Sequence, residues 1–327
     1  MIRFEGNCKM ALVSLNKLKS NRYVFGLLLA VIATCLYSLK GILVKIMYQQ
    51  GIDSISVMAL RIFFILPIYI FIGIMIYTKL TSEQTHSIKS NWYLCCFIGV
   101  IGYYLSSFFD LQSLHYISAQ LSGLVSFTYP MFVCFINWLL FKETFKKGMW
   151  LTLSLSYSGI ILLLSYELNL GDTSGVLFGS AYAIGSSLAF ACYMVFSTQQ
   201  ISQMPSAMFT SIAMGAASIC VFIHFLAEGE WKNIKLTPQV LLLSLTLALA
   251  CTVAPSFILS KAIDYIGANQ VAVMGAFGPV ATAVMAVVIL SEPFSHYHFS
   301  GMALVVLSAS WPFLVNLIKT TLNDIKD

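Results

Sequence analysis

Three charged residues lie within apolar stretches, where they could attract or neutralise charge inside a membrane. Lys40 stands in CLYSLKGILVK, Arg61 in ALRIFFILPIY and Asp110 at the end of YYLSSFFD. A lysine near the bilayer centre costs roughly 2.5–3.5 kcal/mol on insertion scales, and such residues usually face a cavity or a partner. The three residues therefore predict a polar site at membrane depth.

Lys40 has two interpretations. It could line a pathway and attract an anionic group such as a carboxylate or a phosphate. Alternatively it is structural, either pairing with Asp110 or snorkelling towards the interface. Lys45 follows five residues later, about 140° around a helix, so both lysines cannot readily face one narrow pathway. Lys45 is expected to snorkel at the outer interface.

Arg61 and Asp110 are predicted to lie at similar depth, near the outer ends of the second and third apolar segments. A pair between them would neutralise both charges and could form part of an outer gate. Removing one partner would leave the other uncompensated, at a cost of a few kcal/mol. The sequence thus favours a structural role for Arg61.

Tyrosines and prolines extend the candidate site, because a buried hydroxyl needs a partner and a proline kinks a helix. No catalytic or metal-ligating group is predicted, since the sequence holds no G-x-S-x-G, no H-E-x-x-H and no aspartate pair within a span. The predicted substrate pathway comprises Tyr37, Lys40, Arg61, Tyr103, Tyr104, Asp110, Tyr129, Pro130, Tyr193, Gln270 and Pro279.

The composition determines the class of protein. Of 327 residues, 59% are hydrophobic and 9% charged, against about 25% charged in soluble domains. The mean hydropathy of +0.85 indicates a polytopic membrane protein. The net charge of +5 reflects short basic loops and predicts no nucleic-acid binding. The eight cysteines form no C-x-x-C pair, so they are expected to be small buried hydrophobes.

A membrane-spanning helix needs roughly 20 apolar residues, and the apolar runs predict ten such helices. Outside these spans, lysines and arginines gather in the loops that share a side with the N-terminus, and the opposite loops hold only Lys232 and Lys235. Both termini are therefore expected in the cytoplasm. The predicted spans are 24–48, 56–78, 92–110, 116–139, 149–166, 175–198, 207–227, 238–259, 268–290 and 299–318.

The chain also repeats itself at an offset of 149 residues, the spacing between Pro130 and Pro279. The same offset relates Glu143 to Glu292, which are predicted to hold a loop or the contact between the halves. Each half holds five predicted spans, so the second copy should enter the membrane inverted. Inverted repeats are typical of secondary transporters, whose substrate site lies near the midplane between the halves.

The repeat landmarks resemble the EamA group of the drug/metabolite transporter superfamily. The residues that carry the resemblance are YISA, the mid-span proline and LLFKETF in the first half, ILSEPF in the second, and SLKGILVK near the start. Members of one bacterial subgroup often carry a Glu-Arg pair after YISA, where this chain has Ser122 and Gly123. The resemblance implies ten helices and transport of small metabolites, often amino acids and usually outward.

The expected protein is an all-α integral membrane protein of ten transmembrane helices in two inverted five-helix repeats. Its expected divisions are a cytoplasmic tail (1–23), two repeats (24–166 and 175–318) and a second tail (319–327). It should be a secondary transporter of amino acids or other carboxylate-bearing compounds in a bacterial inner membrane. Uptake of an anionic or nucleotide-like compound, and a receptor or assembly subunit, stay open as alternatives.

The expected partners are a small-molecule substrate and the lipid bilayer, with no nucleic acid and no cofactor. The protein is not expected to be an enzyme. Monomer and homodimer both stay open.

Overall fold

The computed structural model describes residues 2–142, 149–169, 173–229, 236–275 and 277–308, and this part of the chain is helical with short connections and no strand. A helical run at 296–308 follows the last labelled element. The elements are α1 (Ile2–Gln49), α2 (Ser54–Tyr77), α3 (Ser82–Gly99), η1 (Val100–Leu105), α4 (Ser106–Tyr116), α5 (Ala119–Ser126), α6 (Tyr129–Phe141), α7 (Met149–Leu168), α8 (Thr173–Ile201), α9 (Ser206–Glu228), α10 (Pro238–Ala248), η2 (Leu249–Val253), α11 (Ala254–Met274) and α12 (Phe277–Leu290).

Eight helical stretches in the described chain are long and apolar enough to cross a membrane, and a ninth apolar helix, Tyr157–Leu168, is shorter. The last predicted span, 299–318, lies only partly within the described residues. The all-helical class is therefore confirmed, whereas the count of ten is not.

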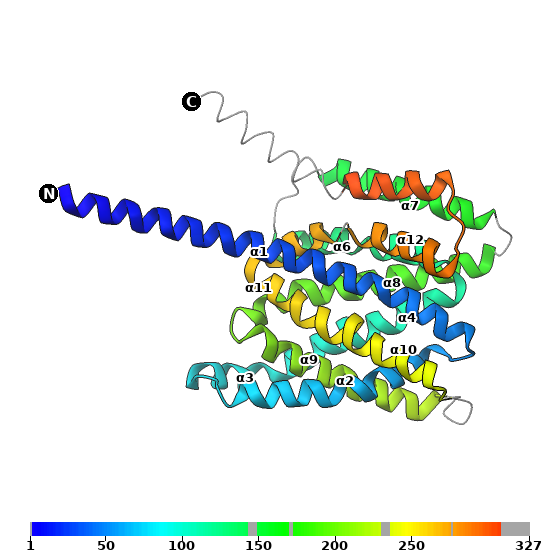
Figure 1. Ribbon diagram of the computed structural model, residues 1–327, viewed down its shortest axis with the longest axis horizontal. Coiled ribbons are helices and arrows are strands. Elements are labelled where there is room, and N and C mark those ends of the chain that lie inside the picture. Colours follow the sequence, from blue (N-terminus) through cyan, green and yellow to red (C-terminus); the bar gives the residue numbers. More distant parts are fainter. Residues whose placement is uncertain (1, 143–148, 170–172, 230–235, 276, 309–327) are drawn as a thin grey trace.

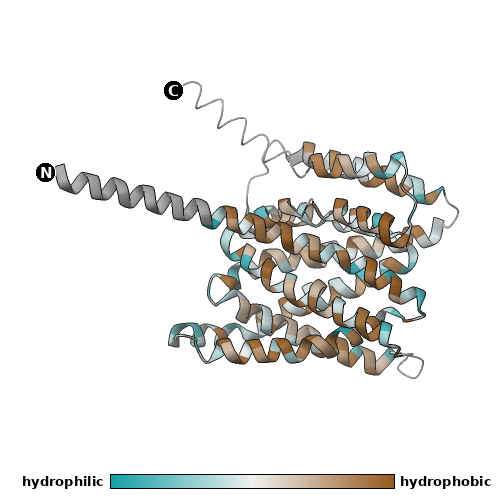
Figure 2. Ribbon diagram, viewed as in Figure 1, coloured by the Kyte–Doolittle hydropathy of each residue, from teal (hydrophilic) through white to brown (hydrophobic). Residues whose placement is uncertain are grey.

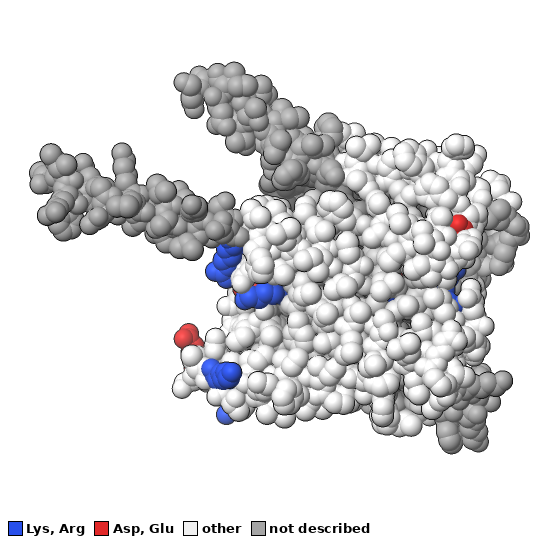
Figure 3. All heavy atoms as spheres, viewed as in Figure 1, with Lys and Arg blue, Asp and Glu red and all other residues white. Residues whose placement is uncertain are grey.

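The outer surface of the bundle suits a lipid environment. Large apolar side chains such as Phe63 and Val288 are each 75% exposed, and the outward faces of the helices are mostly hydrophobic (Figure 2). On the face drawn in Figure 3, charged side chains lie towards the two ends of the bundle, with a broad uncharged band between them. This distribution is typical of a protein that spans a bilayer.

Helices from the first half of the chain pack on helices from the second. α1 lies against α11 and α12, α2 against α9, and α4 against α8, so the bundle interleaves both halves (Figure 1). α7 and the run at 296–308 lie side by side at one edge (Figure 1), where the Gly159 Cα approaches the Gly301 carbonyl closely. The contact surface between the two halves therefore runs through the middle of the bundle.

Irregular backbone occurs at repeat-equivalent places. The two π-helical segments, η1 and η2, begin at Val100 and Leu249, which are 149 residues apart. Each π turn inserts an extra residue into a helix, a feature frequent at functional sites. The repeat offset read from the sequence thus also describes the departures from regular helix.

The helices that contain the two repeat prolines are also broken, as the sequence predicted. α5 ends at Ser126 and α6 begins at Tyr129, so Pro130 occupies the first turn of α6. In the second half α11 ends at Met274 and α12 begins at Phe277, two residues before Pro279. Proline is tolerated in a first turn, where the missing N–H would have no helical partner.

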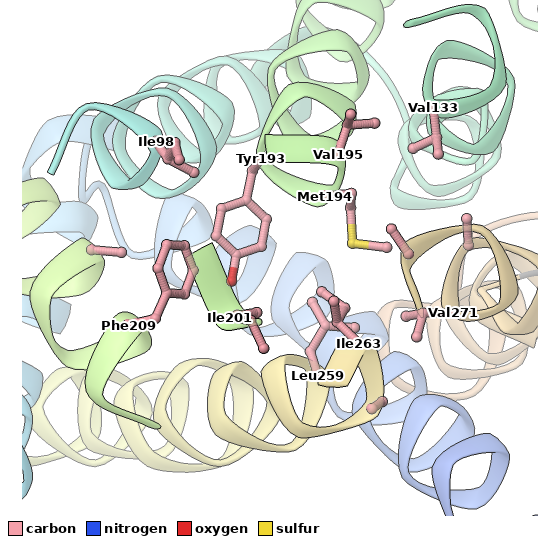
Figure 4. Close-up of a cluster of buried hydrophobic side chains, with 14 of the residues drawn as sticks. Ile98, Val133, Tyr193, Met194, Val195, Ile201, Phe209, Leu259, Ile263 and Val271 are labelled. Carbon is pink, nitrogen blue, oxygen red and sulfur yellow. The ribbon is translucent and has the colours of Figure 1, made fainter. Parts of the chain in front are cut away.

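A buried cluster fixes the inner part of the bundle (Figure 4). Tyr193 of α8, fully buried, lies between side chains from α3, α9 and α11, among them Ile98, Phe209 and Leu259. The hydroxyl of Tyr193 bonds Tyr103 at 2.8 Å and lies 3.4 Å from the Ser260 hydroxyl. The cluster therefore connects both halves through apolar packing and hydroxyl bonds.

Substituting Gly99 with alanine is expected to destabilise the protein. A Cβ at Gly99 would lie 2.2 Å from the Ala213 carbonyl oxygen, so α3 and α9 would have to separate. Gly215, also on α9, has open space where its Cβ would lie, and Gly215→Ala should be neutral or stabilise by roughly 0.5–1 kcal/mol. Thermal melting of the two purified variants checks this, and equal melting temperatures would contradict it.

Candidate functional site

A cavity of about 210 Å³ lies between the two halves. It is lined by residues of α1, α2, η1, α4, α5 and α6 from the first half and of α8, α9, η2, α11 and α12 from the second. Of the predicted pathway residues, those that line it are Tyr37, Lys40, Arg61, Tyr103, Asp110, Tyr129 and Pro279. The structure thus brings together residues that are up to 242 positions apart in the chain.

The two π turns form opposing parts of the cavity wall. η1 contributes Gly102 and Tyr103, and η2 contributes Cys251 and Thr252. Gly102 lets the backbone approach Tyr193 closely, since a Cβ there would lie 2.3 Å from the Tyr193 Cβ. The missing side chain of Gly102 therefore makes room for Tyr193, whose hydroxyl bonds Tyr103 in the cavity wall.

Lys40 forms an ion pair with Asp110 in the cavity wall. The Nζ of Lys40 lies 2.6 Å from Oδ2 of Asp110, and the two side chains are only 21% and 13% exposed. The Ser126 hydroxyl lies 3.5 Å from the other carboxylate oxygen. The charge of Lys40 is therefore neutralised within the protein, although the residue still lines the cavity.

Arg61 does not form the predicted ion pair with Asp110, and that prediction was wrong. Its Nη2 donates a hydrogen bond to the Ser107 hydroxyl at 2.9 Å. The residue is 6% exposed, and its Nε has no hydrogen-bond partner among the described residues. A buried donor without a partner costs roughly 1–3 kcal/mol, so an acceptor in the cavity would relieve a real cost.

Tyrosines supply most of the polar edge of the cavity. The Tyr37 hydroxyl is buried without a hydrogen-bond partner in the described chain. Tyr103 is already bonded to Tyr193, and the Tyr129 hydroxyl donates to the Ala272 carbonyl at 3.2 Å. Of the three cavity tyrosines, Tyr37 is thus the one whose hydroxyl is buried beside the cavity without a hydrogen bond of good geometry within the described chain.

Four predicted pathway residues do not line the cavity. The Tyr104 hydroxyl bonds Nδ1 of His224 at 3.1 Å, and Gln270 accepts a hydrogen bond from Tyr23 in an exposed position. Tyr193 supports the wall from behind through Tyr103. Pro130 shapes the chain beside Tyr129 without reaching the cavity. Tyr104 and Gln270 therefore lie outside this cavity, whereas Tyr193 and Pro130 are next to residues that line it.

Sequence reasoning missed the small residues of the cavity. They are serines, threonines and glycines whose types carry no strong signal, such as Ser38, Ser107, Ser122, Gly123 and Thr282. Repeat symmetry could have found some of them, since Gly278 lies 149 residues after Tyr129 and lines the same cavity. Ser122 and Gly123, where the resembling subgroup carries a charged pair, both face the cavity.

Glu292 joins the halves at one end of the cavity. Its carboxylate accepts hydrogen bonds from the backbone N–H of Ala119 at 2.9 Å and of Gln120 at 3.3 Å, at the start of α5, where an anion is favourable. Lys45 lies 3.6 Å away and pairs with Glu292 rather than standing alone. The predicted half-to-half contact is therefore present at Glu292, whereas Glu143 lies outside the described residues.

Glu292→Ala is expected to destabilise the protein by about 1–2 kcal/mol, the range for loss of a helix cap. The substitution leaves the two N–H groups of α5 and the Lys45 ammonium without this carboxylate. Glu228, whose side chain is 70% exposed and pairs only with His224 at the helix end, provides the matched control Glu228→Ala. Melting curves that move equally for both variants would contradict a connecting role for Glu292.

A comparison with known proteins matches this chain to an EamA-like transporter family model over residues 24–165 and again over 177–313. The chain is 24% identical over 316 residues to the "Uncharacterized transporter sll1319" of Synechocystis sp., covering 89% of this chain and 94% of the relative. It is 22% identical to the "Uncharacterized transporter YcbK" of Bacillus subtilis, covering 82% and 86%.

A solved crystal structure of another protein superposes with a TM-score of 0.65 at 17% identity, over 89% of this chain and 96% of the other, which supports the fold. The two family matches together cover most of the chain and correspond to two repeats. The relatives are named as transporters, and the described helices are those of a multi-pass membrane protein. The chain belongs to the EamA-like transporter family.

Proposed function

We propose that the protein is a secondary transporter of small carboxylate-bearing metabolites that works by alternating access between two inverted repeats. One observation carries the proposal. The central cavity is lined by both halves, and the charged residues among its described lining are two cations, Lys40 and Arg61, and one acid, Asp110. Such a site favours an anion over a cation, because an anion brings its net charge closer to zero.

The dimensions of the cavity agree with a small metabolite. Its volume of about 210 Å³ lies below the roughly 300–1,000 Å³ of pockets for drug-sized ligands. Broken helices beside it, at α5–α6 and α11–α12, are a recurrent feature of transporter substrate sites. Repeats that pack on one another through such helices can expose a central site first to one side and then to the other.

The direction of net transport is proposed to follow the substrate gradient. Asp110 is the only acid in the described cavity lining, and Lys40 holds it in an ion pair. A proton-coupled carrier usually needs a carboxylate that can take up a proton at membrane depth. We therefore favour facilitated diffusion or exchange as the mechanism. Export from the cell would then follow an outward substrate gradient.

The membrane orientation is part of the proposal. The basic loops support a topology with both termini in the cytoplasm of a bacterial cell, in which 1–23 and 319–327 are tails and 24–166 and 175–318 are the repeats. In this orientation the Glu292 contact lies on the outer side of the membrane, and the loop after α2 lies on the cytoplasmic side.

Counterflow into proteoliposomes tests the function. Vesicles are loaded with a pool of unlabelled amino acids and small organic acids, and each labelled compound is offered outside, with protein-free vesicles and Glu228→Ala vesicles as controls. Uptake of a carboxylate-bearing compound that depends on the loaded pool is the expected result. Absence of counterflow for every compound, with protein that elutes as a folded species, would overturn the proposed function.

A further inference from the structure

The charged side chains of the cavity differ in whether they already have an ion-pair partner. Lys40 and Asp110 lie 2.6 Å apart and cancel each other. Arg61 remains as a guanidinium that is 94% buried, has a single hydrogen bond to a neutral hydroxyl, and holds an Nε without a partner in the described chain. The cavity therefore offers one positive charge with an unused donor.

A second unused donor lies close by. The Tyr37 hydroxyl is buried and unpartnered, and Tyr37 lines the same cavity as Arg61. Both side chains belong to the lining of this one cavity, Tyr37 from α1 and Arg61 from α2. A carboxylate has two oxygens that accept hydrogen bonds, and its bonds to a guanidinium are among the strongest in proteins. Two donors in the lining of one cavity, one of them charged, suit one carboxylate.

The described cavity lining offers no comparable unoccupied partner for an ammonium group. The carboxylate of Asp110, the acid of the described lining, is already bonded to Lys40 and approached by Ser126. A zwitterionic amino acid whose carboxylate binds Arg61 would place its ammonium near that guanidinium, or would have to displace Lys40 from Asp110. Either step costs free energy that a substrate without an ammonium group does not lose.

The remainder of the wall suits an apolar body. Phe127, Phe190 and Met214 line the cavity together with the rings of Tyr103 and Tyr129. Apolar walls with a few placed polar groups are the usual form of a small-molecule site. The ring faces lie on both halves of the protein, so an apolar substrate body would contact each half.

We propose that Arg61 and Tyr37 bind the carboxylate of a monocarboxylate with an apolar body, and that the site selects this class over zwitterionic amino acids. This inference rests on the proposed function and deepens it by naming the substrate class. It moves the anchoring role from Lys40 to Arg61, with the Lys40–Asp110 pair as a neutral part of the wall.

Three probes with a matched phenyl body test the selection. 3-Phenylpropionate carries a carboxylate, phenylalanine carries a carboxylate and an ammonium, and phenethylamine carries an ammonium alone. Binding to the purified full-length protein is measured by titration calorimetry at pH 7. The expected dissociation constant of 3-phenylpropionate is at least tenfold lower than that of phenylalanine, and phenethylamine is not expected to bind.

Two conservative variants test the anchor. Tyr37→Phe removes a hydroxyl in the cavity, and Tyr104→Phe removes one outside it, bonded to His224. Tyr37→Phe should weaken 3-phenylpropionate binding three- to tenfold with an unchanged melting temperature, whereas Tyr104→Phe should leave binding unchanged. Equal effects of the two substitutions would overturn the role of Tyr37.

Failure of this inference can be told from failure of the proposed function. If phenylalanine binds as tightly as 3-phenylpropionate, or if folded protein binds none of the three probes, the named substrate class is wrong. Counterflow of some other carboxylate in that case leaves the transport proposal standing. Conversely, selective binding of 3-phenylpropionate without counterflow of any compound, including this probe, would support the site and overturn transport.

Discussion

Lys40→Met lowers the amount and the thermal stability of folded protein, and adding Asp110→Asn restores both: this is the result expected from the cavity pair. Lys40 and Asp110 lie 2.6 Å apart at 21% and 13% exposure. Breaking a buried pair costs about 3–5 kcal/mol, because one charge stays buried without compensation, whereas replacing both partners is often neutral. The pair borders a cavity, so the expected loss lies near the lower figure.

The measurement is gel filtration of heated, detergent-solubilised protein for wild type, both single variants and the double variant. Lys79→Met serves as a control, because Lys79 is exposed beyond the end of α2. Asp110→Asn alone should also destabilise, since it leaves Lys40 and Arg61 in one cavity without an acid. Equal stability of Lys40→Met and wild type, or a double variant worse than either single variant, would contradict the pairing.

The partner of Asp110 in the structure, Lys40, differs from the partner that the sequence favoured, Arg61. Hydropathy places a charged residue at a depth in the membrane, and it placed Lys40, Arg61 and Asp110 close enough to interact. It does not give the direction in which each side chain points. In helices as uniformly apolar as α1 and α2 no polar stripe marks the inner face, so the partner of Asp110 could not be chosen between the two cations.

The π turns add a physical reason for the error. η1 lies between α3 and α4 and ends at Leu105, five residues before Asp110. An extra residue in a helix rotates everything beyond it by about 100° relative to an uninterrupted helix. Tyr104 lies within this segment, and its hydroxyl bonds His224 instead of lining the cavity, whereas Asp110 beyond it does line the cavity.

Features that depend on the repeat were predicted better than those that depend on side-chain direction. The offset of 149 residues located the breaks near Pro130 and Pro279 and the connecting residue Glu292. Gln270 was predicted from its place in an apolar span, yet it follows a break inside α11 at Gly267, where the backbone is not helical (φ 78°), and it accepts a hydrogen bond from Tyr23. Backbone landmarks follow from sequence, whereas cavity lining depends on the rotation and tilt of each helix.

Arg61→Gln is expected to abolish carboxylate transport while the protein still folds. The sequence favoured the opposite result, a lower folded yield, on the assumption of an ion pair with Asp110. In the structure Arg61 has Ser107 as its hydrogen-bond partner, and glutamine can still donate to a hydroxyl. Removing a buried charge that has no ion-pair partner of its own also removes its desolvation cost.

The size of the transport defect follows from the lost interaction. A hydrogen bond to a charged group contributes about 1.5–3 kcal/mol, which corresponds to roughly a ten- to hundredfold weaker carboxylate affinity. Counterflow and melting are measured on the same preparations of wild type, Arg61→Gln and Arg61→Lys. Lysine keeps the charge but not the planar fork that holds a carboxylate by two bonds, so Arg61→Lys should retain a small part of the transport. If Arg61→Gln transports normally, the cation that draws the substrate into the cavity must be Lys40, and its bond to Asp110 must open during transport.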